Sequence, residues 1–112
     1  MSSITDDYMR EMLKTVKPYT IVILRRTSRR DEPGADKLIW EHGRRNFELR
    51  RDRKLCIVCP ITGKGEIAGL GIFSTDPEET RRIMDRDPAV KAGILRYEIH
   101  SAVSFPGDAL GL

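Results

Sequence analysis

The alternation of two kinds of pattern along the chain limits the possible folds more than any other feature. Short apolar runs rich in β-branched residues predict four strands, over residues 19–26, 55–59, 67–73 and 94–103. Amphipathic stretches predict helices over residues 35–51 and 76–87, one after the first strand and one after the third. The resulting order, β-α-β-β-α-β, predicts an α+β fold: a ferredoxin-like sandwich in which two helices cover one face of an antiparallel four-stranded sheet.

A further helical pattern precedes the first strand. Apolar residues recur there at helical spacing until Pro18 ends the stretch: Met9, Met12, Leu13 and Val16. We expect residues 1–18 to form a helical extension that packs onto the domain. The domain itself is expected over residues 19–104, followed by an irregular C-terminal tail over residues 105–112. A chain of 112 residues is long enough for one such domain.

Composition favours a cytoplasmic protein that does not enter a membrane. The longest apolar run, Ile21–Leu24, is far shorter than the roughly 20 residues that a bilayer helix needs. Asp6 and Asp7 interrupt the beginning of the chain, where a secretory signal would be apolar. Hydrophobic residues make up 39% of the chain, which is enough for one modest core and too much for a disordered tail.

The pair Cys56 and Cys59 has the spacing of redox and zinc motifs, but its surroundings favour another interpretation. The two residues lie in an apolar, strand-like run, where side chains three positions apart point to opposite faces. No second pair of cysteines or histidines lies nearby to complete a zinc site. We therefore expect two buried free thiols, and no metal, flavin or nucleotide signature is present elsewhere in the sequence.

The excess of basic residues in one segment suggests nucleic-acid binding, but the arrangement of the charges and the composition of the third strand argue against it. Residues 25–54 contain eleven basic and six acidic residues, but the charges alternate as they do on a solvated helix face. RNA-recognition domains share the β-α-β-β-α-β order and need basic and aromatic residues on their third strand. The segment Gly69–Ser74 offers one phenylalanine and no basic residue, so nucleic acid is not the expected partner.

The helix predicted over residues 35–51 divides into an apolar and a charged half, and a histidine lies in the apolar half. The members of that half are Ile39, Trp40, His42, Gly43, Asn46, Phe47 and Leu49. We expect this half to face the sheet, with His42 beside small or polar neighbours. A histidine on an inward face can also be a core residue with satisfied nitrogens, and the helical pattern does not distinguish the two roles.

Two aspartates mark expected helix starts in the second half of the chain. Asp76 precedes Pro77 and is followed by Glu79, the pattern of an N-cap with a capping box. Asp87 precedes Pro88 in the same way and is expected to cap a short helical turn. This capping role explains Asp87 structurally and is compatible with a functional one.

Several of these residues together resemble the YciI-like (YCII-related) proteins, a family of the dimeric α+β barrel superfamily. The matching residues span positions 19–103 and are Tyr19–Arg26, His42, Lys54-Leu55, Pro60, Gly69, the segment Asp87–Gly93 and Tyr97-Glu98. The segment from Asp87 to Gly93 is the most specific of them. The chain departs from the family at Cys59, where a glycine usually precedes the proline, and at Asp52-Arg53, where a glycine usually ends the helix.

The resemblance implies a homodimer, and the apolar first two strands agree with it. Two helices cover one face of such a sheet, so an apolar second face needs another cover, which a second copy would provide. The resemblance further implies a His–Asp pair, His42 and Asp87, in a pocket at the cleft between sheet and helix. A carboxylate bonded to one ring nitrogen fixes the tautomer and increases the basicity of the other.

The implied activity is proton transfer of a lyase, isomerase or dehydrochlorinase type on a small, anionic or aromatic molecule. His42 would be the general acid/base and Asp87 would orient it. Residues expected to contact the substrate are Arg25, Asn46, Cys59, Pro60 and Tyr97. The alternative is a non-catalytic small-ligand-binding or interaction module with the same fold. For Arg25 a solvated surface position is the other interpretation, and for Tyr97 a core position. His100 is expected on the surface.

Overall fold

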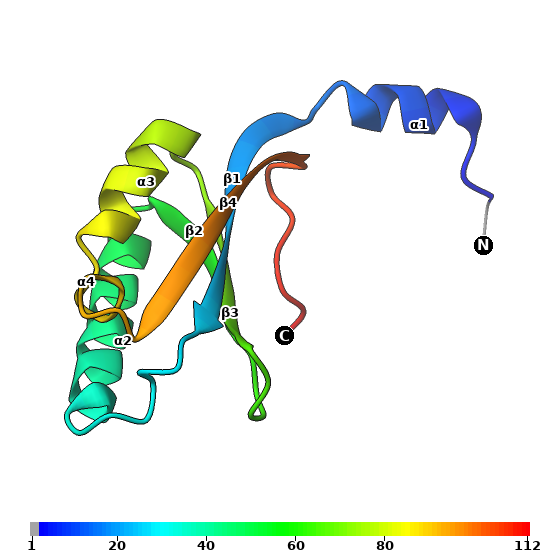
Figure 1. Ribbon diagram of the computed structural model, residues 1–112. Coiled ribbons are helices and arrows are strands. Elements are labelled where there is room, and N and C mark those ends of the chain that lie inside the picture. The colour runs from blue at the N-terminus through cyan, green and yellow to red at the C-terminus, as the bar shows by residue number, and fades with distance from the viewer. Residues whose placement is uncertain (1–2) are drawn as a thin grey trace.

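The computed structural model describes residues 3–112, which form a four-stranded sheet with helices on one face (Figure 1). The elements in chain order are α1 (Asp6–Leu13), β1 (Lys17–Arg26), α2 (Ala35–Arg51), β2 (Leu55–Pro60), β3 (Ile67–Phe73), α3 (Pro77–Asp85), α4 (Pro88–Lys91) and β4 (Leu95–Ser104). Neighbouring strands are antiparallel in the order β2-β3-β1-β4. The predicted ferredoxin-like fold is therefore confirmed.

The strand register assigns each residue of the central strand β1 to one face of the sheet. Val22 lies opposite Gly71 on β3 and Ile99 on β4, on the face that the helices cover. Ile21 lies opposite Ile72 and His100, on the face without helices. The side chains of β1 on both faces of the sheet include apolar residues, so each face needs a cover. The helices cover only one of the two faces.

The hydrophobic core lies between the helices and the sheet. Its buried members are Val22, Leu24, Leu55, Phe73, Ile83, Met84, Ala89 and Leu95. From α2, Ile39 and Leu49 pack against this cluster, as expected. Trp40 and Phe47 were expected to face inward, but they are 70% and 64% exposed. The sheet covers a narrower stripe of α2 than the full apolar half, because Trp40 and Phe47 lie beyond the residues that contact it.

The predicted helix starts are present and are capped by the expected aspartates, but the capping box predicted at Glu79 does not close, because this side chain pairs with Lys54 instead. The carboxylate of Asp76 accepts a hydrogen bond from the N–H of Glu79 at 2.8 Å, and Pro77 is the first residue of α3. The side chain of Glu79 lies 3.4 Å from the ammonium of Lys54. Asp87 caps α4 in the same way as Asp76 caps α3. These caps fix where the chain turns between α3, α4 and β4.

The end of α2 is a left-handed turn formed without glycine. Lys54 donates to the carbonyl of Leu49 and Arg53 donates to the carbonyl of Arg50, both at 3.0 Å. This pattern requires a left-handed residue, and Arg53 adopts it with φ of 60°. A side chain in this conformation costs roughly 1–2 kcal/mol. The helix thus ends in the arrangement that usually takes glycine, although this chain has arginine there.

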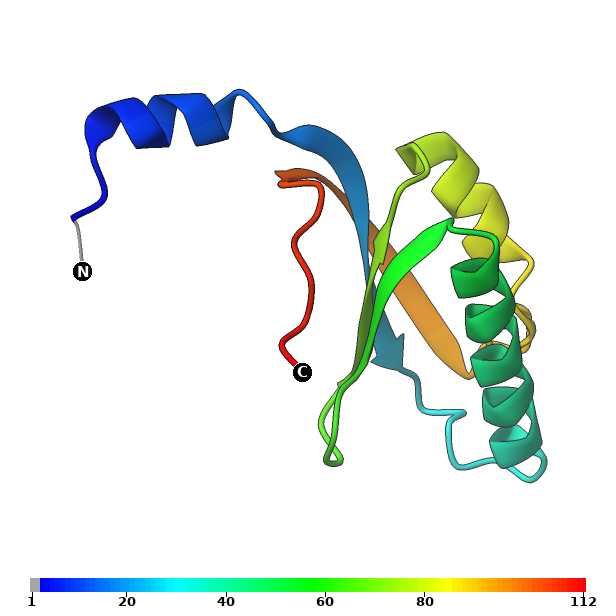
Figure 2. The same cartoon turned by 180° about the vertical axis from the view of Figure 1, so that it is seen from behind.

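The N-terminal helix forms as predicted but does not pack onto the domain. Thr5 caps α1 by accepting from the N–H of Tyr8, yet no residue of α1 is buried. Figures 1 and 2 show α1 projecting from the start of β1 on the side of the sheet away from the other helices. The expected packing onto the domain was wrong. An amphipathic pattern indicates that one side of a helix will be covered, but it does not identify which surface covers it.

Both cysteines are free, as predicted, but they are less buried than expected. Cys56 is exposed and Cys59 is half-buried. They lie on β2, an edge strand whose pairing with β3 is irregular between Leu55 and Ile57. An edge strand has a neighbour on one side only, so its side chains are less enclosed.

Within residues 3–112, no helix has the length and apolar content to cross a bilayer.

Candidate active site

A cavity of about 350 Å³ lies between α2 and the sheet, and most of its wall is apolar. Glycines create part of this space. Gly69 and Gly71 of β3 lie opposite Leu24 and Val22, on the helix side of the sheet, and provide no side chain beneath α2. Across from them, a Cβ at Gly43 of α2 would have no heavy atom within 4 Å. The volume is at the lower end of the range for small-molecule pockets.

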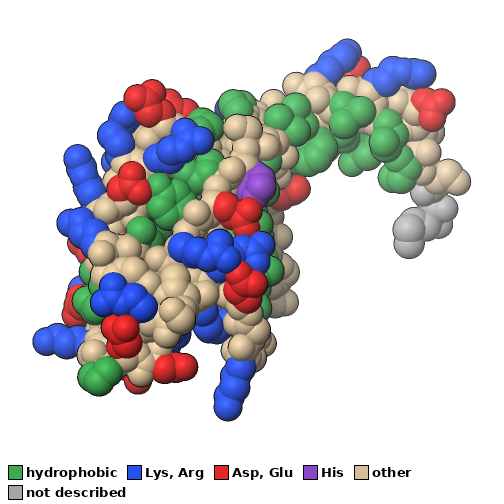
Figure 3. Space-filling model, viewed as in Figure 1, with side chains coloured by type: hydrophobic (Ala, Val, Ile, Leu, Met, Phe, Trp, Pro, Cys, Tyr) green, Lys and Arg blue, Asp and Glu red, His purple; other side chains and the backbone are tan. Residues whose placement is uncertain are grey.

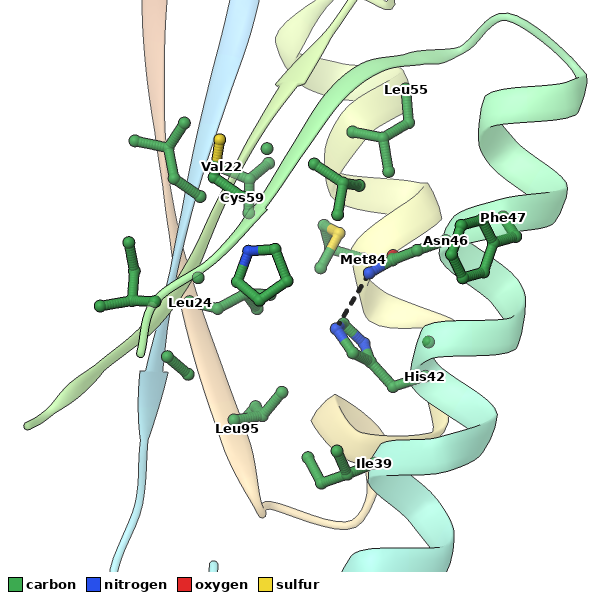
Figure 4. A pocket seen from close by; sticks show the side chains of 18 of the residues that line it. Val22, Leu24, Ile39, His42, Asn46, Phe47, Leu55, Cys59, Met84 and Leu95 are labelled. Carbon is green, nitrogen blue, oxygen red and sulfur yellow. Dashed lines mark hydrogen bonds between the residues drawn. The ribbon is translucent and has the colours of Figure 1, made fainter. Parts of the chain in front are cut away.

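His42 and Asp87 meet at the wall of this cavity. The His42 ring extends from the middle of α2 toward the sheet (Figure 4). Its Nδ1 lies 2.7 Å from Oδ1 of Asp87, and Asp87 is only 1% exposed. Asp87 reaches the ring from the junction of α3 and α4 and does not itself line the cavity. The predicted convergence of these two side chains is present.

Asp87 caps a helix and binds the histidine at the same time, through different oxygens. Its Oδ2 accepts from the backbone N–H groups of Ala89 and Val90, at 3.0 and 3.2 Å. Its Oδ1 is left for His42. The two backbone bonds hold the carboxylate in place, so the capping geometry itself sets the direction of the bond to the imidazole.

The hydrogen-bond network fixes the tautomer of His42. Because an ionised carboxylate only accepts, Nδ1 must carry the hydrogen that it shares with Asp87. In a neutral imidazole, Nε2 on the other side of the ring then has the free electron pair. The amide nitrogen of Asn46 lies 3.3 Å from Nε2 and donates to it (Figure 4). The basic nitrogen is therefore held away from Asp87 and capped by a half-buried amide one helical turn further on.

Arg45 adds a positive charge beside the pair. Its Nη1 lies 3.8 Å from Oδ1 of Asp87, the oxygen that binds His42. The same nitrogen is buried and has no hydrogen-bond partner among residues 3–112. The Arg45 side chain as a whole is 23% exposed. His42 and Arg45 thus both lie beside the same carboxylate oxygen of Asp87.

The sequence assigned Arg45 to the charged half of α2 and missed this contact. His42 and Arg45 are three positions apart on one helix, a spacing that places side chains side by side. That spacing was the available signal, but it indicates proximity to His42 and not to Asp87. The contact depends on α4 lying against α2, which the local pattern does not encode.

Of the residues expected to bind substrate, three border the cavity. These are Asn46, Cys59 and Pro60. Pro60 lies opposite Gly69, on the helix side of the sheet. Cys59 lies opposite Leu70, which the register assigns to the face without helices. Cys59 therefore borders the cavity at the edge strand while its register position belongs to the other face.

Arg25 and Tyr97 do not border the cavity. Arg25 lies opposite Arg96 in the sheet, and its Nε donates to Glu98 at 2.8 Å. This bond lowers the pKa of the Glu98 carboxyl. Tyr97 packs against the core, and its hydroxyl donates to Asp85 at 2.6 Å. Burial and this bond raise the pKa of Tyr97 to about 12, so the phenol keeps its proton.

Fold and site together define the chain as a small α+β domain of the ferredoxin-like fold with a buried His–Asp pair beside a cavity. Among solved structures it is similar to 5-chloro-2-hydroxyhydroquinone dehydrochlorinase (TftG) from Burkholderia phenoliruptrix AC1100, in complex with 2,5-dihydroxybenzoquinone. The TM-score is 0.53 and the sequence identity is 15%, over 73% of this chain and 90% of that chain. This similarity establishes the fold. No protein-family model matches the sequence, and no curated protein matches it.

Proposed function

We propose that the chain is a homodimeric enzyme that transfers a proton on a small molecule, in a lyase, isomerase or dehydrochlorinase type of reaction. His42 is the general acid/base and Asp87 orients it. The observation that carries this proposal is the 2.7 Å bond between Nδ1 of His42 and Asp87, which leaves Nε2 with a free electron pair at the cavity wall. The sequence resemblance and the structural similarity to a dehydrochlorinase support the reaction class.

The residues divide the work of proton transfer. Nε2 accepts a proton from the bound molecule, and the charge that develops on the imidazole is stabilised by the carboxylate at Nδ1. In an isomerisation, Nε2 then returns the proton to another atom of the molecule. In an elimination, the electron pair of the broken C–H bond forms the new double bond, the leaving group departs with its own bonding pair, and the proton passes from Nε2 to solvent. Asp87 holds the same hydrogen bond throughout, because its other oxygen is fixed by the N-terminus of α4.

Asn46 must change its hydrogen bond as His42 changes its protonation state. In the structure its amide N–H₂ donates to the free pair of Nε2. A protonated Nε2 is a donor, so it can only bond to the carbonyl oxygen of the same amide. A substrate that delivers a proton to Nε2 therefore has to displace the amide nitrogen, and a turn of the amide then stabilises the imidazolium.

The cavity favours a small, anionic or aromatic substrate. Its walls are mainly apolar, and Arg26, Arg30 and Arg50 are among its lining residues. Among residues 3–112, Arg50 forms no salt bridge with a carboxylate, and its guanidinium lies 5.5 Å from the centre of the Phe47 ring. A cation without a carboxylate partner beside an aromatic ring provides a binding partner for a phenolate or carboxylate.

Replacement of His42 tests the catalytic proposal. A screen of small phenolic, lactone and halogenated compounds is expected to identify turnover by the wild-type protein. For such a compound, His42→Gln is expected to reduce kcat by about 10²- to 10⁴-fold, because the general base is lost. The matched control is Arg44→Gln, which makes a replacement by the same residue at an exposed position of α2 that does not line the cavity. Equal activity of His42→Gln and wild type would refute the proposal.

A non-catalytic binding module is the second candidate, and Asn46 is the observation that favours it. The amide satisfies Nε2, as neighbours do for a structural histidine. In this case a phenolate or carboxylate ligand binds to the wild-type protein without being converted. Binding measured by calorimetry would then persist in His42→Gln, whereas the enzyme is expected to lose turnover and retain at most part of its binding.

The proposed homodimer is supported by the composition of the sheet face without helices. Apolar side chains from three strands share this face: Tyr19, Ile21 and Ile23 on β1, Ile57 on β2, and Leu70 and Ile72 on β3. Such a face needs a cover, because extended apolar patches are rare on monomeric proteins. A second copy facing it would bury the same residues from both chains, as a two-fold interface does.

A further inference from the structure

The helix α1 has a clear amphipathic pattern but no partner in its own chain. Its apolar side contains the exposed residues Tyr8, Met9 and Leu13, and the exposed Ile4 precedes its N-cap. Figure 3 shows apolar side chains gathered along one side of this projecting segment. The opposite side contains two exposed ion pairs, Asp7–Arg10 and Glu11–Lys14. The helix is therefore organised to bury one side, although none of its residues is buried.

An eight-residue helix of this kind needs a tertiary contact in order to persist. Isolated helices shorter than about 12–15 residues are marginal in water, and ion pairs three positions apart add only a few tenths of a kcal/mol each. The shape of the chain shows how far α1 stands from its own core. The radius of gyration is 16.6 Å, whereas a compact chain of this length has about 13 Å. The contact that stabilises α1 must then come from outside this chain.

The position of α1 indicates which surface supplies that contact. It continues directly into β1, which provides Tyr19, Ile21 and Ile23 to the sheet face without helices. Both α1 and this face look onto the same side of the molecule (Figures 1 and 2). A second copy that covers the sheet face therefore comes to lie beside α1, and by two-fold symmetry its own helix lies beside the first copy.

The charges of α1 argue against a lipid surface as the cover. Helices that lie on membranes are rich in lysine and arginine on their polar side. In α1 the polar side combines three acidic residues with two basic ones: Asp6, Asp7, Glu11, Arg10 and Lys14. Such a helix gains little from an anionic headgroup region, and a protein surface is the better match.

We propose that α1 is an exchanged arm: in the homodimer, the apolar side of α1 from each copy packs against the other copy, beside its helix-free sheet face. This proposal rests on the homodimer of the proposed function and is independent of its chemistry, because α1 lies outside the cavity. The arm extends the interface beyond the sheet faces and holds the two copies together from both ends. The helix α1 lies outside positions 19–103, the segment that resembles the YciI-like proteins.

Paired substitutions on the two sides of α1 test the arm in the full-length chain. Met9→Gln with Leu13→Gln removes apolar contacts while keeping helix propensity. Arg10→Gln with Lys14→Gln makes the same replacement on the polar side and is the matched control. By sedimentation equilibrium, the first pair is expected to raise the dimer dissociation constant at least about tenfold. The control pair is expected to stay within about twofold of wild type.

Photocrosslinking between isotopically distinct copies tests the exchange itself. Light protein with p-benzoylphenylalanine in place of Tyr8 is mixed with ¹⁵N-labelled wild type, and crosslinked peptides are identified by mass spectrometry. Crosslinks that join a light α1 peptide to a heavy peptide of the sheet support the proposal. Crosslinks confined to light peptides of the same molecule, in a sample where mixed dimers have formed, would show that the arm folds back and would overturn it.

Other outcomes separate the arm from the remaining proposals. A wild-type protein that is monomeric would overturn both the arm and the homodimer. An unchanged dissociation constant for the Met9/Leu13 pair would overturn the arm alone. Co-sedimentation of wild type with phosphatidylserine vesicles, lost in this pair while the dissociation constant stays unchanged, would assign α1 to membranes instead. Loss of activity in His42→Gln with normal dimerisation would leave the arm supported.

Discussion

Asp87 is the residue on which both the local fold and the proposed chemistry depend. One oxygen caps α4 and the other binds His42, so a single carboxylate connects two segments that are 45 positions apart in the sequence. The structural and functional interpretations of Asp87 are therefore compatible, and they use separate atoms. This separation of atoms allows the two roles to be tested independently.

We expect Asp87→Asn to separate activity from stability. The asparagine oxygen can still accept from the N–H groups of α4, but its amide N–H₂ would face Nδ1 and force the hydrogen to Nε2. Activity is expected to fall to about the level of His42→Gln, with unfolding free energy lowered by only about 1 kcal/mol. Kinetics and urea unfolding of the same preparation measure the two effects. Wild-type turnover in this variant would show that the tautomer does not matter.

The matched variant Asp87→Ala removes both roles. The loss of the cap and of the acceptor for a buried imidazole N–H is expected to lower the unfolding free energy by about 2–4 kcal/mol. If urea unfolding gave the same stability for the alanine and asparagine variants, the cap would contribute nothing measurable.

The elements α2 and β3 form the cavity by omitting side chains at facing positions. Gly43 lies on the helix, and Gly69 and Gly71 lie on the strand. The two elements differ in how tightly they are packed at these glycines. A Cβ at Gly43 would meet open space, whereas one at Gly71 would lie 3.1 Å from Leu55 and 3.2 Å from Phe73. Equivalent substitutions should therefore have opposite effects on stability.

We expect Gly43→Ala to raise the unfolding free energy by up to about 1 kcal/mol, because alanine has the higher helix propensity and the site has room. Gly71→Ala is expected to lower it by about 1–3 kcal/mol, because Leu55 and Phe73 must move. Thermal and urea unfolding measure both changes.

Gly43→Leu is the functional version of this comparison. Its side chain extends into the cavity beside His42, so substrate binding is expected to weaken. The unfolding free energy is expected to be at least as high as that of Gly43→Ala. Retained KM in Gly43→Leu would show that the substrate does not occupy this part of the cavity.

Within residues 3–112, two apolar surfaces have no helix that covers them: the half-buried helix-free sheet face and one side of α1. Both lie on the same side of the sheet (Figures 1 and 2). The cavity lies on the opposite side of the sheet, beneath α2. The proposed assembly and the proposed chemistry therefore use different faces of the sheet, and we expect substitutions on one face to leave the function of the other intact.

We expect the wild-type protein to be a dimer and Ile72→Glu to be monomeric. Ile72 lies opposite both Ile21 and Ile57 on the helix-free face, so a carboxylate there would be buried between two copies. The control is Trp40→Glu, which places the same charge at an exposed position of α2. Light scattering after gel filtration measures the mass, and circular dichroism checks the fold. A dimeric Ile72→Glu protein would place the interface elsewhere.

Local patterns were sufficient for the order and approximate limits of the elements. The β3 strand begins and ends where expected, and the caps at Asp76 and Asp87 are formed by the side chains that the sequence indicates. These features depend on interactions among residues a few positions apart. The position of His42 on the inward side of α2 follows from the same short-range periodicity.

Contacts between distant segments could not be read from such patterns. Trp40 and Phe47 continue the apolar half of α2, but both are largely exposed, and of the two only Phe47 borders the cavity. Arg45 has the spacing of a surface residue and reaches Asp87 because α4 lies against α2. Arg25 and Tyr97 fall on suitable strands, yet their faces and partners direct them away from the cavity.

The amino-acid order thus defined the strands, helices and caps, because hydrogen bonding and side-chain periodicity act over a few residues. Packing in three dimensions defined the cavity, because its volume depends on which glycines of β3 come to lie beneath α2. The same packing brought Asp87 to His42 and left α1 uncovered. Burial is a property of surfaces that meet, and those surfaces belong to segments far apart in the chain.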